Sequence, residues 1–446
     1  MLPLIIGLVL VIAFALHKAL FTPLPSPKAP APTEKGEEKA RPFGVWDAVK
    51  FAYPRVSAWV GFNIEGTKPI PFRPFRWGPS YPINMGIRPM GWENWIELDS
   101  DYRKTHAIRL ERTTTRGELA SRTLPGYRAQ ALECLLEICS YLSFRHPDLF
   151  VVTRATYDAA KPETHGDSLV GEKGGAVTSI HNKITDELWD FVEIEKRKGA
   201  DWNPMYYAGL LGQDDLAVMV EGTDGQYFFQ AGSICTAGFW RLQDKIGLSL
   251  EDIHSRGVVP GWKDKLKFSM ERFFQKLKVD KPVQRNNYFF QIDDQLAWSS
   301  NTNGPEEIFH QGEKGPVAEL LKASEDPTWK APAPTNNFED IWFRTERQTL
   351  RRMPKTGCIL FTIRTYFHKV ADIANEKGVP GRMASAIRSW PDDVSLYKGG
   401  PLYAGVMLPK LDALHAEQLA SGVVELDDEG AVVGEPKYPF VSSDLA

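Results

Sequence analysis

His254 is the residue whose type and surroundings first suggest chemistry. It lies in the stretch LEDIHSRGVVPGW, just after Ser249 and Asp252, which have the spacing of a helix N-cap followed by an acidic residue. A strongly amphipathic segment, 262–277, follows it. A neutral imidazole is the commonest metal ligand, and haem iron is often held by a histidine. The spacing fits a surface or helix-capping histidine as well.

Other metal and nucleotide sites find little support in the sequence. No second histidine or cysteine is close enough to His254 to predict a zinc site. The four cysteines show no C-x-x-C spacing, and we expect reduced, mostly buried thiols. GEKGG and GTDG match neither the P-loop nor the dinucleotide fingerprint, and no G-x-S-x-G elbow is present. The chain therefore does not look like a self-sufficient nicotinamide or flavin enzyme.

A dense group of charges lies in the stretch FRTERQTLRRM. Within nine residues it holds one glutamate and four arginines: Arg344, Glu346, Arg347, Arg351 and Arg352. Arginines protect the exposed edge of a sheet, so a solvent-facing edge strand is one interpretation. The other is that a guanidinium on one strand face binds an anion such as a haem propionate, or bound oxygen.

Two further sites leave similar alternatives open. Arg285, followed by Asn286 and Asn287, has either a structural role or an anion-binding one. Asp214 and Asp215 either belong to a turn or supply a carboxylate to a cationic substrate.

The elements that must position these residues follow from hydrophobic periodicity. Apolar spacing predicts a helix over 125–147 and another over 262–277. Alternation and turn residues predict two hairpins and one more strand: 214–221 with 226–234, 338–353 with 358–367, and 284–292. The order of two strands, helices and three strands is the connectivity of a PAS domain, whose helices enclose a pocket beside a small antiparallel sheet. We therefore predict an α+β, PAS-like fold with flanking helices and an N-terminal helical extension.

Composition restricts the partners. The 446 residues carry a formal net charge of −4, with 53 basic and 57 acidic side chains and no dense basic block. Such a chain offers no electrostatic footprint for a phosphate backbone, so nucleic acid is not an expected partner. A hydrophobic content of 43% is enough for a full core.

The N-terminal segment suggests a membrane anchor. Residues 1–21 are almost entirely apolar, which predicts one transmembrane helix, with a cleavable signal peptide as the alternative. The lysines and arginines, beginning with Lys18, all follow the uninterrupted apolar run 2–16, so we expect the remaining chain in the cytosol, anchored at the endoplasmic reticulum membrane. A Pro-rich, charged linker over 22–43 precedes a domain over 44–426, with its PAS-like core at about 205–370. Residues 427–446 read as a flexible acidic tail.

Several motifs resemble one family. QDDLAVM, AGSICTAGFWRLQDKIGLSLEDIH, VPGW and MERFFQKLKVDKPVQRNNYF occur in order, and RTERQTLRRMPKTGCILFTIRTY is the most specific. With MGIRPMGWENWIELDSDYRK before them, they are similar to the haem-dependent oxidative N-demethylase family, alpha-subunit-like. The anchor and spacer resemble the layout of fungal, membrane-anchored haem oxygenases.

The resemblance implies a PAS-like fold that binds haem b and activates oxygen at its iron to oxidise an amine. It makes His254 the axial metal ligand, places Arg285 in cofactor binding, and gives catalytic roles to Glu346, Arg347 and Arg364. Electrons would come from NADPH through a partner reductase that carries FMN and a 2Fe–2S centre. IHSRGVVPG departs from the His-x-Pro-x-Pro segment of bacterial members, and with the added anchor this leaves dimethylamine in doubt as substrate. A larger amine or a secondary metabolite is the alternative.

Three other functions compete with this enzyme. The first is a haem PAS sensor of gas or redox state, although no transmitter, kinase or DNA-binding segment follows the predicted core. The second is a haem-free scaffold protein. The third uses Cys358 as a thiolate ligand, but Cys358 begins a predicted strand and lacks a Gly-rich cysteine loop.

Overall fold

The computed structural model describes residues 41–49, 56–156, 175–306, 333–428, 432–434 and 440–441. Residues from Phe43 onward form one compact unit, and all that follows concerns this unit. Most of the predicted tail at 427–446 lies outside the described residues.

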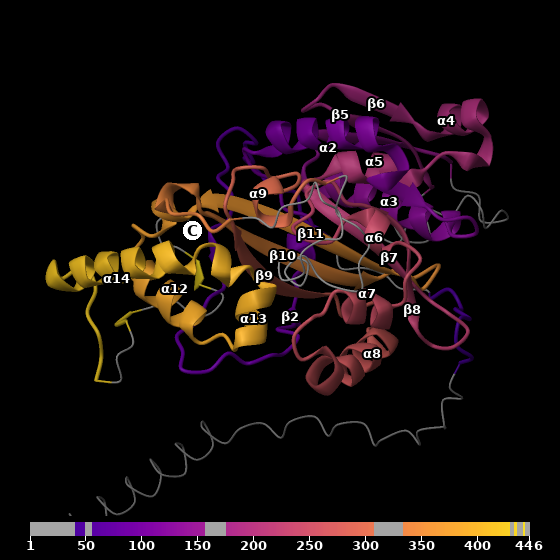
Figure 1. Cartoon of the computed structure of the whole chain (residues 1–446). Helices are drawn as coiled ribbons and strands as arrows, with labels where there is room; N and C mark the ends of the chain where they lie inside the picture. The colour runs from indigo at the N-terminus through magenta and orange to yellow at the C-terminus, as the bar shows by residue number, and fades with distance from the viewer. Residues whose placement is uncertain are drawn as a thin grey trace, which may run out of the picture. The chain divides into compact units, whose positions relative to one another are not determined.

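A seven-stranded antiparallel sheet forms the centre of the unit (Figure 1). Its order is β2-β9-β10-β11-β7-β8-β3. The strands are β2 (Arg88–Pro89), β3 (Ser121–Thr123), β7 (Asp214–Glu221), β8 (Tyr227–Ser233), β9 (Val283–Gln291), β10 (Trp342–Arg352) and β11 (Ile359–Lys369). The two predicted hairpins are confirmed, because β7 pairs with β8 and β10 pairs with β11.

Two smaller sheets and the helices complete the unit. A three-stranded sheet has the order β4-β5-β6, and β1 pairs with β12. These strands are β1 (Phe72–Arg73), β4 (Phe150–Arg154), β5 (Val177–Asn182), β6 (Glu187–Asp190) and β12 (Phe440–Val441). The α-helices are α2 (Tyr102–Arg116), α3 (Arg128–Arg145), α4 (Phe191–Lys198), α5 (Pro204–Leu211), α6 (Leu242–Lys245), α7 (Leu250–Arg256), α8 (Lys267–Lys276), α9 (Ser300–Asn303), α11 (Val370–Ile373), α12 (Val379–Arg388), α13 (Asp392–Tyr397) and α14 (Ala404–Ala420). Short 3₁₀ turns are η1 (Trp92–Asn94), η2 (Gly117–Leu119), η4 (Gly199–Asp201), η6 (Phe338–Asp340) and η7 (Gly400–Leu402), and η5 (Trp262–Leu266) is a π-helix.

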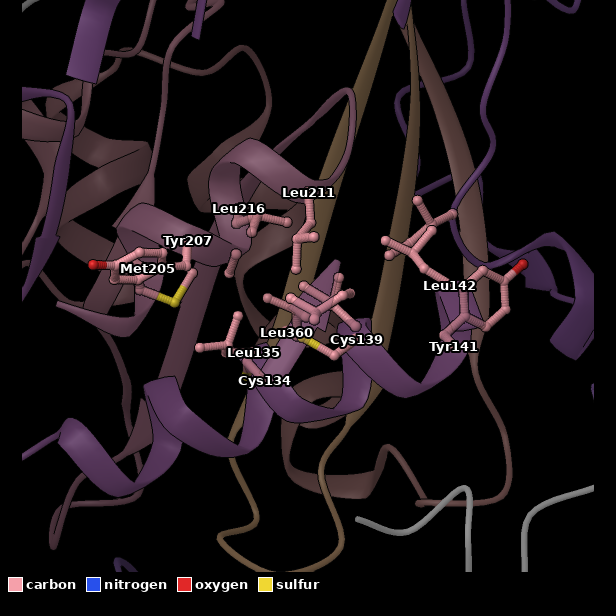
Figure 2. Packing of buried hydrophobic residues seen from close by; sticks show 14 of the residues in the cluster. Cys134, Leu135, Cys139, Tyr141, Leu142, Met205, Tyr207, Leu211, Leu216 and Leu360 are labelled. Carbon is pink, nitrogen blue, oxygen red and sulfur yellow. The ribbon is translucent and has the colours of Figure 1, made fainter. Parts of the chain in front are cut away.

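Helices α3 and α5 cover one face of the central sheet, which we call the rear face (Figure 1). Figure 2 shows this packing, in which Cys134 and Leu135 of α3 and Leu211 of α5 meet Leu216 of β7 and Leu360 of β11. All four cysteines are buried free thiols, which confirms that prediction. Because alternate residues of a strand point to opposite faces, Leu216 and Leu360 fix which residues of β7 and β11 face the rear.

Helices α7 and α8 and the π-helix η5 cover the opposite, front face. The strand residues Ala217, Met219, Phe229, Leu350 and Ile359 contribute to this second hydrophobic cluster. A third cluster joins β9 and β10 to helices α11 to α14, which come after the predicted PAS-like core.

The predicted fold class needs correction. The fold is mixed α/β with a larger sheet than a small PAS-like one, because β2 and β3 from the N-terminal part of the chain extend both of its edges. The described residues contain twelve α-helices, four of which follow β11. No helix among them is long and apolar enough to cross a membrane, and residues 1–21 lie outside the described ranges. The transmembrane helix, and the membrane localisation inferred from it, therefore find no support.

Strand β10 is buried on both faces, and its arginines need protein partners for that reason. Arg344, Arg347, Arg351 and Arg352 are each at most 2% exposed. The interpretation as a solvent-facing edge strand is wrong, because β10 pairs with β9 on one side and β11 on the other. On the rear face, Arg351 forms a fully buried ion pair with Glu137 of α3.

We expect the Glu137→Gln substitution to be strongly destabilising. It leaves the charge of Arg351 buried without its counter-charge, which costs about 3 to 5 kcal/mol of unfolding free energy. Asp412→Asn is the matched control, because the Arg388–Asp412 pair is half exposed and such pairs contribute about 0 to 1 kcal/mol. Urea unfolding followed by tryptophan fluorescence measures both. Equal losses in the two variants would contradict the assignment.

Candidate functional site

A cavity lies between the front face of the sheet and helices α7, η5 and α8. Its volume is about 310 Å³, within the range of small-molecule sites. Most of its wall is apolar: Ala217, Met219, Phe229, Leu350, Phe361 and Ile363 from the strands, and Leu250, Ile253, Leu266, Met270, Phe273 and Phe274 from the helices. We call it the central cavity.

His254 lines the central cavity from the last turn of α7. The predicted N-cap positions this helix, since the Ser249 side chain accepts a hydrogen bond from the backbone N–H of Asp252 at 3.0 Å. The His254 ring stacks on Trp262, with centroids 4.2 Å apart and planes 15° apart. Trp240 is nearly perpendicular to it, at 86°, with the ring centroids 5.4 Å apart. Two tryptophans therefore fix the plane of the imidazole.

The protonation of His254 follows from one hydrogen bond. Its Nδ1 lies 2.7 Å from the carbonyl oxygen of Leu250, and because a carbonyl can only accept, Nδ1 carries the proton. Burial, with a smaller contribution from the positive charge of Arg285, lowers the pKa of His254 to about 4. At neutral pH the ring is therefore uncharged, with the lone pair on Nε2. That tautomer is the one that binds a metal through Nε2.

A cluster of polar groups interrupts the apolar wall. Glu346, Gln348, Arg285 and Asn287 project into the cavity from β10 and β9. The Oε2 atom of Glu346 accepts hydrogen bonds from Gln348 at 2.7 Å and from Asn287 at 3.3 Å. Among the described residues none donates to Oε1 of Glu346, which leaves this oxygen for a ligand.

Lys398 reaches the same cavity from the residue after α13. It is only 5% exposed, and its ammonium donates a hydrogen bond to the carbonyl oxygen of Tyr288. It lies over the rings of Tyr288 and Trp390, 4.6 and 5.5 Å from their centroids. Burial lowers the pKa of Lys398 to about 7, with Glu346 opposing that shift and Arg285 adding to it.

The structure brings together three of the five residues predicted for the site. His254, Arg285 and Glu346 line the central cavity, whereas Arg347 and Arg364 do not. Arg347 is paired with Arg364 across β10 and β11, and both face the rear because their positions alternate with those of the cavity residues. There Arg347 forms an ion pair with Glu97 at 3.2 Å, and Arg364 pairs with Asp99. We call these two ion pairs the rear network.

The two aspartates at the start of β7 separate in the same way. Asp215 lines the cavity, but its carboxylate is occupied by Arg109 at 2.6 Å and by the backbone N–H groups of Cys235 and Thr236. Asp214 faces the rear network, and in the described part of the chain neither of its carboxylate oxygens has a hydrogen-bond partner. Neither aspartate lies in a turn, because both belong to β7.

The sequence did not indicate Lys398 as a residue of the site. The weak case that it gave for Cys358 as a thiolate ligand agrees with the structure. Lys398 comes after the predicted core, and nothing in its local pattern distinguishes it from a surface lysine. Cys358 is a member of the rear-face cluster, with its sulfur 3.8 Å from that of Cys134. It does not line the central cavity, so the thiolate alternative has no geometric basis.

Fold and site together define a mixed α/β protein with an apolar internal cavity and one neutral, rigidly held histidine in its wall. The model of the haem-dependent oxidative N-demethylase, alpha subunit-like, family matches residues 86–408. The chain belongs to this family, whose name describes haem-dependent oxidative enzymes. The matched range includes every residue of the central cavity from Ile87 to Lys398.

Asp214, beside the rear network, makes the stability of the protein depend on pH. Burial raises the pKa of Asp214 to about 6 against the opposing charges of Arg364 and Arg347. The folded protein thus holds this proton more tightly than the unfolded chain, and the stabilisation is lost as pH rises from about 4 to 6. We expect Asp214→Asn to match the parent at pH 4 and to exceed its unfolding free energy by about 3 kcal/mol at pH 8.

Urea unfolding at both pH values measures this difference. Asp412→Asn is the control, because Arg388 lowers the pKa of Asp412 and its effect has the opposite sign. If the parent and Asp214→Asn differ by the same amount at pH 4 and pH 8, Asp214 does not titrate as described.

Proposed function

We propose that this protein is a haem-dependent monooxygenase that oxidises the carbon next to an amine nitrogen. The observation that carries the proposal is the state of His254, whose Nδ1 proton is committed to Leu250 and whose ring is clamped by tryptophans. His254 is the one histidine among the described residues that line this mostly apolar wall, and its Nε2 carries a lone pair. A neutral histidine held in this way would serve as a ligand of haem iron.

Haem b would supply the iron at which dioxygen is activated, and the chain's own residues would position the reactants. His254 would hold the iron. The apolar walls from α8 and the strands would exclude water from the reaction space. Oε1 of Glu346 would bind the ammonium group of the substrate and so orient the carbon that reacts.

The overall chemistry requires electrons from outside the chain. One oxygen atom is inserted into the C–H bond, the other leaves as water, and two electrons and two protons are consumed. The resulting carbinolamine decomposes to an aldehyde and the dealkylated amine. The sequence carries no nucleotide fingerprint, so we propose an NAD(P)H-dependent reductase with FMN and a 2Fe–2S centre as electron donor.

The first test is the absorption spectrum of the full-length chain after haem supplementation. We expect a Soret band that shifts with carbon monoxide after reduction. His254→Ala removes the proposed iron ligand, so its band is lost or displaced, and added imidazole restores it. His181→Ala is the control, since His181 lies on β5 and does not line the cavity. A parent that takes up no haem would support the scaffold alternative instead.

The second test concerns Glu346. We expect a cationic secondary amine to perturb the Soret band, and Glu346→Gln to weaken that binding about tenfold or more, because a charge-assisted hydrogen bond is lost. A neutral ether of the same shape is the matched control, and its weaker binding is unaffected by the substitution. Equal weakening for amine and ether would assign Glu346 a structural role only.

A turnover assay distinguishes the proposed enzyme from a haem sensor. With reductant and oxygen, the enzyme releases an aldehyde in proportion to the oxygen consumed. A sensor forms the same gas complexes and releases none.

A further inference from the structure

Charge is distributed unevenly around the central cavity. Four cationic side chains line it: Arg241, Lys245, Arg285 and Lys398. Arg241 is neutralised by a two-contact ion pair with Asp244, at 2.8 and 2.7 Å. The carboxylates in the wall are Asp215, which is occupied by Arg109, and Glu346. Among the described residues, the wall therefore has more basic than acidic side chains.

Two of these basic side chains, Arg285 and Lys398, line the cavity where β9, β10 and α13 meet. Glu346 and Arg285 line the cavity from the paired strands β10 and β9, and the charges of both act on Lys398. Lys398 forms no ion pair with any carboxylate in the described part of the chain, although it is almost completely buried. Of its three N–H groups, the Tyr288 carbonyl accepts one. Buried ammonium groups without an anionic partner are rare, because desolvation is costly.

We propose that Lys398, together with Arg285, binds the carboxylate groups of the porphyrin. Haem b has two propionates and no other anionic substituent, so the two cations match its charges one for one. Glu346 then keeps its negative charge for a cationic substrate. This inference rests on the proposed function, and it assigns to α13 and Lys398, outside the predicted core, a direct part in the site.

The geometry favours carboxylate binding over a role for Lys398 in packing alone. The rings of Tyr288 and Trp390 confine the ammonium group, and the bond to Tyr288 directs it. Confinement of this kind lowers the entropy lost when an anion binds. Lys245 offers the contrast: it is a lysine of the same cavity, but it lies over Trp240, at the histidine side of the site.

The test compares haem with its dimethyl ester, in which both carboxylates are neutral. Full-length apoprotein is titrated with each, and binding is followed by tryptophan quenching and by the Soret band. We expect Lys398→Met to weaken haem binding about tenfold or more while leaving ester binding unchanged. Lys398→Arg keeps the charge and retains most of the affinity. Arg285→Gln behaves like Lys398→Met.

The controls keep the outcomes distinct. Circular dichroism and urea unfolding of each apoprotein show whether a variant is folded. If Lys398→Met does not fold, Lys398→Arg still tests whether a positive charge at this position supports haem binding. Lys245→Met is expected to bind haem and ester with the same relative affinity as the parent. The inference is overturned if Lys398→Met weakens both ligands equally, or if Lys245→Met alone shows the haem-specific loss. In those cases haem uptake by the parent still stands, whereas a parent that binds no haem overturns the proposed function as well.

Discussion

Strand β10 is buried on both faces, and this constraint organises the protein. Each of its charged side chains has to find a partner inside the protein, and alternation along the strand sends successive residues to opposite faces. Arg347 and Arg351 point to the rear face, where they form ion pairs with Glu97 and Glu137. Glu346 and Gln348 point to the front face and line the central cavity. One strand therefore both ties the helical layer to the sheet and supplies the polar groups of the site.

The rear network and the cavity are separate for the same reason. Arg364 and Asp214 point away from the cavity, because they alternate with residues that line it on β11 and β7. A dense ion network stiffens the sheet from behind without adding charge to the reaction space. The cavity can then be mostly apolar, with a small number of polar groups gathered at one end.

His254 depends on local structure more than on the sheet. Its helix begins at a serine cap, its Nδ1 donates to a carbonyl of that same helix, and its ring rests on the first residue of the following π-helix. The bond from Nδ1 to the carbonyl oxygen fixes the tautomer with the proton on Nδ1 in the absence of a ligand. Lys398 is positioned differently, by Tyr288 of β9 and Trp390 beyond α12, so the two ends of the site rely on different parts of the chain.

Local pattern in the sequence determined the two hairpins, the long helix over 125–147 and the cap before His254, because these depend on neighbours a few residues apart. The family motifs led to His254, Arg285 and Glu346, which share the cavity. Tertiary structure alone decided that the arginines of β10 are buried, since an edge strand and a central strand have the same local pattern. It also decided the wider sheet and the part played by Lys398. Burial of a charge depends on partners that are distant along the chain, such as Glu137 for Arg351 and Tyr288 for Lys398. Local spacing in the sequence does not predict these partners.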